Sequence, residues 1–233
     1  MKKTLITLLA LSSISYGFTY SDANTWLQTA LVEDITSYTI TFQIDDAWSK
    51  AGGENIFTFS SAAGDQWHIR HEVARYMGLS TDGSSVDGSY ASRDGSDTTY
   101  TINLDEVGAY NKWFFDGNKG NNSNGLKGVT VEISCDSTTG TSITLTAPGK
   151  TVILESAEKY YAPATDGTFG FISTDSNLKN GTFMKSLEIE YTANGVTYSA
   201  AYPDAVIPSV PEPATATLSL LALAGLAARR RRK

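Results

Sequence analysis

The sequence predicts an all-β domain built as a two-sheet antiparallel sandwich, and three observations lead to this class. Apolar and polar residues alternate over residues 38–44, with Tyr38, Ile40, Phe42 and Ile44 on one parity, which is the period of a half-buried strand. About ten such short runs follow one another, separated by clusters of Gly, Asn, Asp and Ser that favour turns. The runs show no internal repeat, which favours a sandwich or jelly roll over a propeller.

The predicted strands fill most of the chain. In order they are residues 38–44, 56–60, 66–73, 99–104, 129–135, 142–147, 151–155, 170–173, 185–192 and 196–200. Asn194-Gly195 and Pro148-Gly149 predict tight turns between neighbouring strands. Residues 23–33 carry the spacing of apolar residues that is typical of a helix.

The N-terminal residues have the layout of a secretory signal peptide. Lys2 and Lys3 precede an apolar run over residues 4–14, and small residues follow it. Cleavage after Gly17 and cleavage after Ala23 both satisfy the small-residue rule, so the sequence leaves both open. We therefore expect the domain that follows to be exported.

The C-terminal segment combines three features in a fixed order. A proline-flanked acid comes first, an uncharged apolar run over residues 214–228 follows, and a basic cluster ends the chain. As a helix the run would be about 22 Å long, short of the roughly 30 Å hydrocarbon core of a bilayer, and snorkelling arginines can cover the deficit. The basic cluster favours the cytoplasmic side of the membrane. The cluster consists of Arg229, Arg230, Arg231, Arg232 and Lys233.

This composite tail resembles the PEP-CTERM sorting signal of exopolysaccharide-making Gram-negative bacteria, with the triplet that names it at Pro211, Glu212 and Pro213. In that family an exosortase, a membrane protease, recognises the tail and cleaves near the triplet. The resemblance implies export through the inner membrane to the cell envelope or the extracellular space, with transient or stable anchoring by the C-terminal helix.

The expected division of the chain follows from these end segments. Its parts are a signal peptide at 1–23, a β-sandwich domain at 24–204, a linker at 205–213, a transmembrane helix at 214–228 and a basic cytoplasmic end at 229–233.

Net charge limits the class of partner. The chain has 18 basic and 25 acidic residues and a net charge of −7. Seven of the basic residues lie in the two end segments, so 11 basic residues remain against 25 acidic ones and the exported part is near −14. Such a surface repels nucleic acid. We expect no nucleic-acid partner.

A second resemblance concerns the domain itself and covers residues 36–200. The succession of short motifs is similar to the concanavalin A-like, laminin G-like jelly roll, in which a late Gly-x-Phe-x-Ile strand precedes the terminal core strand. The motifs are residues 55–60, 67–69, 78–80, 128–134, 167–172 and 186–191. The resemblance implies a fold and leaves the function open.

Residues suited to catalysis are sparse. A glycosidase needs two carboxylates across a cleft, and the Glu-x-Asp-x-Glu strand of jelly-roll glucanases does not occur. Glu188 and Glu190 alternate with apolar residues and are expected to face solvent. His68 and His71 would point to opposite faces of a strand, which argues against a zinc site, and Cys135 shares the parity of a core strand. We expect a protein that is not an enzyme.

Two features of the loops suggest that they bind calcium or sugars. Asp116 and Asn118 begin an Asn/Gly-rich loop whose oxygens suit calcium, although the same residues also make ordinary turns. Aromatic rings near such loops can stack on sugars, although a run of rings must also place some in the core. The candidate stacking residues are Trp113, Phe115, Tyr160 and Tyr161.

Three functional classes therefore remain. The first is an exosortase-sorted cell-surface or matrix protein with a non-catalytic domain, which needs no cofactor beyond a structural calcium ion. The second is a lectin-like module that binds exopolysaccharide or other glycans. The third is a polysaccharide hydrolase, which would need two carboxylates brought together from distant strands.

Overall fold

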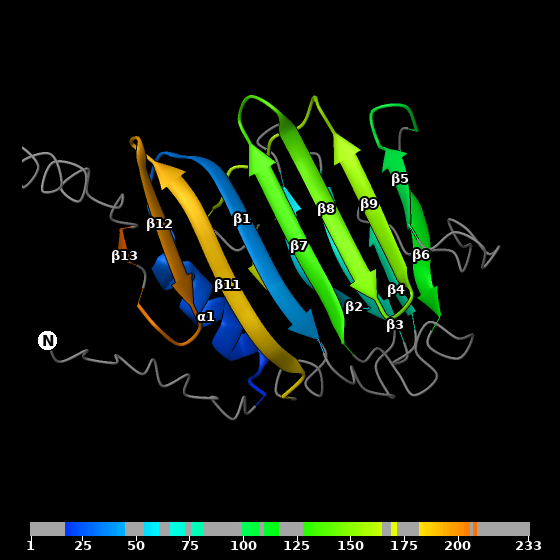
Figure 1. The fold of residues 1–233 in the computed structure, drawn as a ribbon, viewed down its shortest axis with the longest axis horizontal. Helices are drawn as coiled ribbons and strands as arrows, with labels where there is room; N and C mark the ends of the chain where they lie inside the picture. Colours follow the sequence, from blue (N-terminus) through cyan, green and yellow to red (C-terminus); the bar gives the residue numbers. More distant parts are fainter. Residues whose placement is uncertain are drawn as a thin grey trace, which may run out of the picture.

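The part of the chain that the computed structural model describes forms two β-sheets and one α-helix (Figure 1). The described residues are 17–44, 54–60, 66–72, 76–81, 99–107, 110–116, 128–164, 169–171, 182–205 and 207–208. The prediction of a mostly β protein with two sheets is confirmed. The finer jelly-roll topology stays a prediction.

The larger sheet has eight strands, and each neighbouring pair is antiparallel except the pair of β9 with β5, which is parallel. Their spatial order is β13 (Ile207–Pro208), β12 (Val196–Ala201), β11 (Met184–Ala193), β1 (Ile35–Ile44), β7 (Val129–Asp136), β8 (Gly140–Ala147), β9 (Lys150–Ser156) and β5 (Thr99–Asn103).

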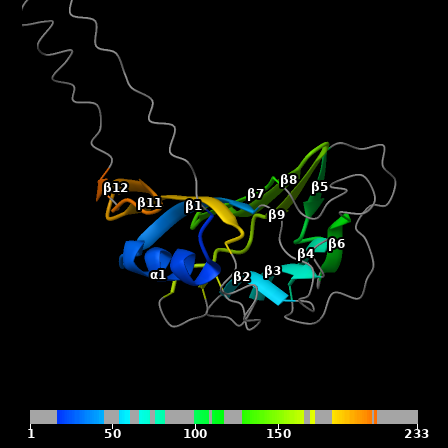
Figure 2. The same ribbon diagram turned by 90° about the horizontal axis from the view of Figure 1, so that it is seen from below.

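The smaller sheet has five antiparallel strands. Their order is β10 (Gly170–Phe171), β2 (Glu54–Ser60), β3 (Gln66–Glu72), β4 (Tyr76–Ser80) and β6 (Asn111–Asp116). Figure 2 shows the two sheets as separate layers, with the helix on the same side of the larger sheet as the smaller one.

The core lies between the layers and follows from the alternation in the strands. Ile40 and Phe42 of β1 are fully buried, and Ile40 lies opposite Ile133 of β7 and Ile189 of β11. The ring of Phe42 stacks against Phe57 of the smaller sheet with centroids 5.9 Å apart. The apolar face of each sheet is thus removed from water against the other, which is the main stabilising contribution to such a fold.

The hairpin between β11 and β12 forms as the sequence predicts. Asn194 and Gly195 have φ values of 52° and 75°, the left-handed conformation that both central residues of a type I′ turn require. The turn fixes the register, so Tyr191 pairs with Tyr198 and their rings stack 5.0 Å apart.

The helix α1 (Tyr20–Ala30) begins three residues earlier than the sequence pattern indicates. Thr19 is its N-cap: the Asp22 backbone N–H donates to the Thr19 hydroxyl at 3.0 Å, and the Thr19 backbone N–H donates to the Asp22 carboxylate at 3.2 Å. This capping box satisfies two helix-terminal donors. The predicted start at Ala23 was wrong because the polar capping residues Thr19 and Asp22 precede the apolar spacing on which the prediction rests.

Three strands were not predicted. β4 contains Gly78, β6 is an aromatic run without alternation, and β13 lies inside the segment 205–213 that the sequence suggests as a linker. Proline is tolerated on an edge strand, where its missing N–H faces outward, and β13 is the edge of the larger sheet.

Within the described residues, no helix is long and apolar enough to span a bilayer. The predicted transmembrane run at 214–228 lies outside those residues.

Candidate functional site

The outward face of the larger sheet carries a straight row of polar residues across five strands. Glu190 lies opposite Thr39, Thr39 opposite Ser134, Ser134 opposite Ser142, and Ser142 opposite Glu155. Each of these positions alternates with a buried residue on its own strand, so the row projects away from the core.

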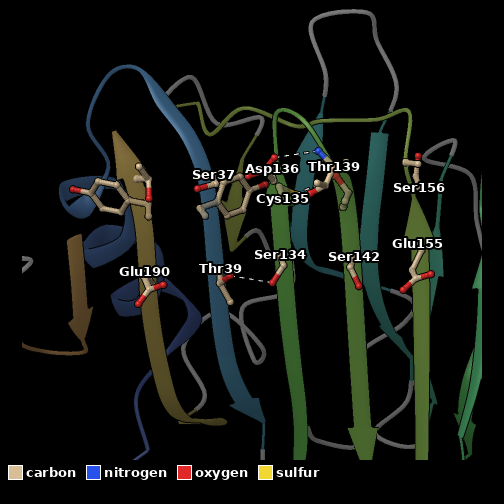
Figure 3. Close-up of a pocket in the computed structure, with 16 residues that line it drawn as sticks. Ser37, Thr39, Ser134, Cys135, Asp136, Thr139, Ser142, Glu155, Ser156 and Glu190 are labelled. Atoms are coloured by element: carbon tan, nitrogen blue, oxygen red, sulfur yellow. Dashed lines mark hydrogen bonds between the residues drawn. The ribbon is translucent and has the colours of Figure 1, made fainter. Parts of the chain in front are cut away.

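This row crosses a shallow hollow of about 480 Å³ at one end of the sheet (Figure 3). A second hollow of about 280 Å³ lies beside it and shares Thr39 and Glu190 with it. We call the two together the outer groove. Hydroxyl and carboxylate side chains dominate the lining of the outer groove. They belong to Ser37, Thr39, Thr41, Ser134, Asp136, Ser142, Glu155, Glu188, Glu190, Thr192 and Ser199.

Hydrogen bonds hold the side chains of the outer groove in place near the β7–β8 turn. The Thr39 and Ser134 hydroxyls are 3.0 Å apart and bonded to each other. The Asp136 carboxylate accepts from the Thr138 backbone N–H at 2.7 Å, from the Thr138 hydroxyl and from the Thr139 N–H at 3.1 Å. The bonds from Thr138 hold the pKa of the Asp136 carboxyl below its ordinary value, because they favour the charged form. Asp136 is therefore an ionised part of the β7–β8 turn.

A second set of contacts fixes the end of β9. The buried Ser156 hydroxyl donates to the Asp105 carboxylate, which also accepts from the Ala157 N–H at 2.7 Å. Gly140, with φ of 89°, lies against the Ser156 carbonyl so closely that a Cβ atom would overlap it. The close approach of β8 to the end of β9 thus needs glycine for both conformation and space.

The electrostatic character of the groove is acidic. Among the described residues that line it, four carry a carboxylate and none is lysine or arginine. Glu155 and Glu190 are separated by four strand intervals, about 19 Å, well beyond the 5–9.5 Å between glycosidase carboxylates. Glu132 and Glu188 flank Thr41 and are two intervals apart, about 10 Å at the backbone. Both are exposed on an open sheet face.

The side chains on the inner face of the same strands are buried in the core. Cys135 is 2% exposed and its sulfur lies 3.2 Å from the Thr141 hydroxyl. Burial raises the pKa of the Cys135 thiol, which keeps it in the unreactive neutral form. The prediction that Cys135 faces the core is confirmed.

Two of the four rings considered for sugar stacking lie in the core. Phe115 and Tyr161 are fully buried, and the ring of Tyr161 packs 5.1 Å from that of Trp67. Both rings therefore lie in the core, which is the alternative that the sequence leaves open for them. Tyr160 is half-buried and donates its hydroxyl proton to the Ile35 carbonyl at 2.6 Å. Trp113 lies in β6, where the structure describes its backbone but not its side chain.

The two calcium candidates lie outside the side chains that the structure describes, so the calcium site stays a prediction. Asp116 ends β6 with its side chain outside the described residues, and Asn118 lies wholly outside them. No group of three acidic, histidine or cysteine side chains arranged for a metal occurs among the described residues. His68 is buried, and its Nδ1 is 2.8 Å from the Thr58 hydroxyl. The sorting triplet Pro211–Pro213 and the basic cluster 229–233 also lie outside those residues.

Sequence reasoning missed the outer groove. The signal was present: Thr39 and Thr41 in β1, and Ser142 and Thr144 in β8, occupy the positions between the apolar residues. Such positions face outward, but which strands become neighbours cannot be read from them.

The comparisons with known proteins identify the C-terminal segment. Residues 209–233 match the model of the PEP-CTERM protein-sorting motif. The motif is therefore present in this chain, and it implies processing by an exosortase and export to the cell envelope or extracellular space of a Gram-negative bacterium. No curated protein matches the chain.

Proposed function

We propose that the chain is an exosortase-sorted protein of the cell surface or extracellular matrix whose β-domain has no catalytic role. The observation that carries the proposal is the sorting motif at residues 209–233, which follows β13 of the domain directly. The mature protein then acts through its place in the envelope and the contacts of its surface.

The anchoring step follows from the tail. Residues 214–228 form a short transmembrane helix in the inner membrane, and the basic cluster 229–233 holds its end on the cytoplasmic side. The domain stays on the outer side, attached transiently until the exosortase cuts or stably when it does not.

A concanavalin A-like, laminin G-like jelly roll is the topology we propose for the domain. Two face-to-face sheets with predominantly antiparallel pairing are compatible with it. Shape alone does not make such a domain an enzyme. The glutamates of the outer groove are exposed on an open sheet face and do not lie across a cleft, which supports a non-catalytic role.

The experiment compares the natural chain with a triplet variant in a Gram-negative host that contains an exosortase. Replacing Pro211, Glu212 and Pro213 by alanine should leave the protein at full length in the inner membrane, while the natural chain reaches the surface or medium. Thr217→Ala, a neutral change inside the tail, is the matched control and should behave like the natural chain. Equal localisation of the triplet variant and the control would contradict the proposal.

Glycan binding is the second candidate, and the outer groove favours it. Its hydroxyl and carboxylate groups can donate to and accept from sugar hydroxyls along several strands. Neutral sugars are better suited than acidic ones, because the carboxylates would repel a polyanion.

A glycan panel, read with and without calcium, tests this candidate. Ser142→Leu inside the groove should lower binding at least tenfold, since it removes a hydroxyl and fills the hollow. Thr146→Leu lies on the same face of the same strand outside the hollow and should bind like the natural chain. Loss on Trp113→Ala alone would move the site to β6, and calcium dependence would support an ion near Asp116 and Asn118.

The same panel addresses the hydrolase alternative. Turnover of a polysaccharide that disappears in Glu132→Gln and in Glu188→Gln would assign these carboxylates a catalytic role and contradict the non-catalytic proposal. Binding without turnover would agree with a lectin-like module.

A further inference from the structure

The sorting motif begins almost directly after a strand of the folded domain. Pro208 of β13 lies opposite Tyr198 and Ile207 opposite Ser199, at the edge of the larger sheet (Figure 1). Ser209 and Val210 then precede the triplet that starts at Pro211. An extended chain covers at most about 3.3–3.6 Å per residue, so the triplet begins within about 10 Å of the sheet edge while β13 is paired.

The turn before β13 is firmly attached. The Tyr202 N–H donates to the Leu187 carbonyl and the Asp204 N–H to the Ala201 carbonyl, each at 2.8 Å. The indole N–H of Trp26 in α1 donates to the Asp204 carbonyl at 2.8 Å. The chain is thus fixed to both the sheet and the helix as far as Asp204.

The pairing of β13 with the sheet is much shorter than this attachment of the preceding turn. It has two register pairs with one neighbour, and Pro208 supplies no backbone N–H to that ladder. If β13 leaves β12, the fixed point moves back to Asp204, and the reach to Pro211 rises from three residues to seven, about 24 Å.

We infer that β13 is a releasable strap, and that the exosortase cleaves the tail only after β13 has detached from β12. The inference rests on the proposed function, because it concerns processing of the same tail. An enzyme that recognises an extended peptide uses its backbone N–H and C=O groups. While β13 is docked, β12 occupies such groups three residues before the triplet. The short reach from the sheet edge then leaves little room for a protease around the residues that precede the triplet.

A reversible cross-link between the two strands tests the strap in the full chain. Ser199 and Ile207 are facing residues of an antiparallel pair, whose Cα atoms lie about 4.5–5.5 Å apart, within the range a disulfide accepts. The double variant Ser199→Cys with Ile207→Cys closes the bond in the oxidising exported compartment, and Cys135 is buried away from it. Each single cysteine variant is a matched control, and loss of the tail is followed by intact mass over time.

We expect the cross-linked chain to lose its tail at least tenfold more slowly than either single variant. A reductant should restore the rate, and so should six Gly/Ser residues inserted between Pro208 and Ser209 of the cross-linked chain, since they lengthen the reach without releasing β13. Equal rates in the cross-linked and single variants would overturn the strap, as would a slow rate that persists after reduction. A natural chain that never loses its tail would instead overturn exosortase processing, on which the strap depends.

Discussion

The ring of Phe18 stacks on the ring of Tyr202, with centroids 4.2 Å apart and 22° between the ring planes. The backbone of Phe18 also exchanges two hydrogen bonds with Met184, at 3.0 and 3.2 Å. The first described residues are thus packed against the turn that precedes β13, and the two ends of the domain meet beside the start of β11.

This relationship favours one of the two cleavage points predicted for the leader. Cleavage after Ala23 would remove Phe18, the Thr19 cap and Tyr20, which is 2% exposed. We predict cleavage after Gly17, which leaves all of them in the mature protein. N-terminal mass analysis of the exported protein should find Phe18 first, and a protein that starts at Asn24 would contradict the prediction.

The Thr19 cap should contribute measurably to stability. Thr19→Ala removes the side-chain acceptor for the Asp22 N–H and should lower the free energy of unfolding by about 1 kcal/mol, with 0.5–2 as the range for such caps. Urea unfolding of the mature protein measures it. Thr25→Ala is the control, because Thr25 is an exposed threonine inside the same helix; an equal loss in both variants would show that the cap contributes nothing specific.

Gly140 and Gly149 together separate the cost of a left-handed backbone from the cost of a steric clash. Both have positive φ, of 89° and 79°, but a Cβ on Gly149 would meet no atom within 4 Å, while one on Gly140 would overlap the Ser156 backbone. Gly149→Ala should cost about 1–2 kcal/mol for the left-handed conformation alone. Gly140→Ala should cost about 1–3 kcal/mol more, because the clash forces β8 and β9 apart. Similar unfolding midpoints for the two variants would contradict the close approach.

Asp136 should make stability depend on pH at the acidic end. Its pKa is lower in the folded protein than in the unfolded chain, because the bonds from Thr138 favour the carboxylate. Its contribution is therefore present above the unfolded pKa of about 3.9 and is lost as the pH falls through the folded value. Asp136→Asn keeps an acceptor oxygen without the charge, so the variant should lose less stability than the natural protein between pH 5 and pH 2, as measured by urea unfolding. Parallel curves would contradict the role of the charge.

Local patterns made much of the larger sheet predictable. The alternation in β1 identifies Ile40 and Phe42 as core residues, and Asn194-Gly195 identifies the turn between β11 and β12, because both depend on neighbours in sequence. The parallel pairing of β5 with β9 depends instead on residues such as Thr99 and Thr151, which lie far apart in the chain. No local pattern specifies that pairing.

The site was less predictable than the fold for two physical reasons. A run of aromatic residues does not reveal which rings face inward, so Phe115 could be assigned to the core only from its place in the smaller sheet. The outer groove exists because Thr39, Ser134 and Ser142 fall into one row, and that row is a consequence of strand order and register.

In the function that we propose, the sorting motif directs this domain out of the cell. The most direct test is the intact mass and location of the natural chain in a Gram-negative host with its exosortase and in the same host without it. We expect a tail-less protein on the surface or in the medium of the first host, and a full-length protein held in the inner membrane of the second. The same mass and location in both hosts would contradict it.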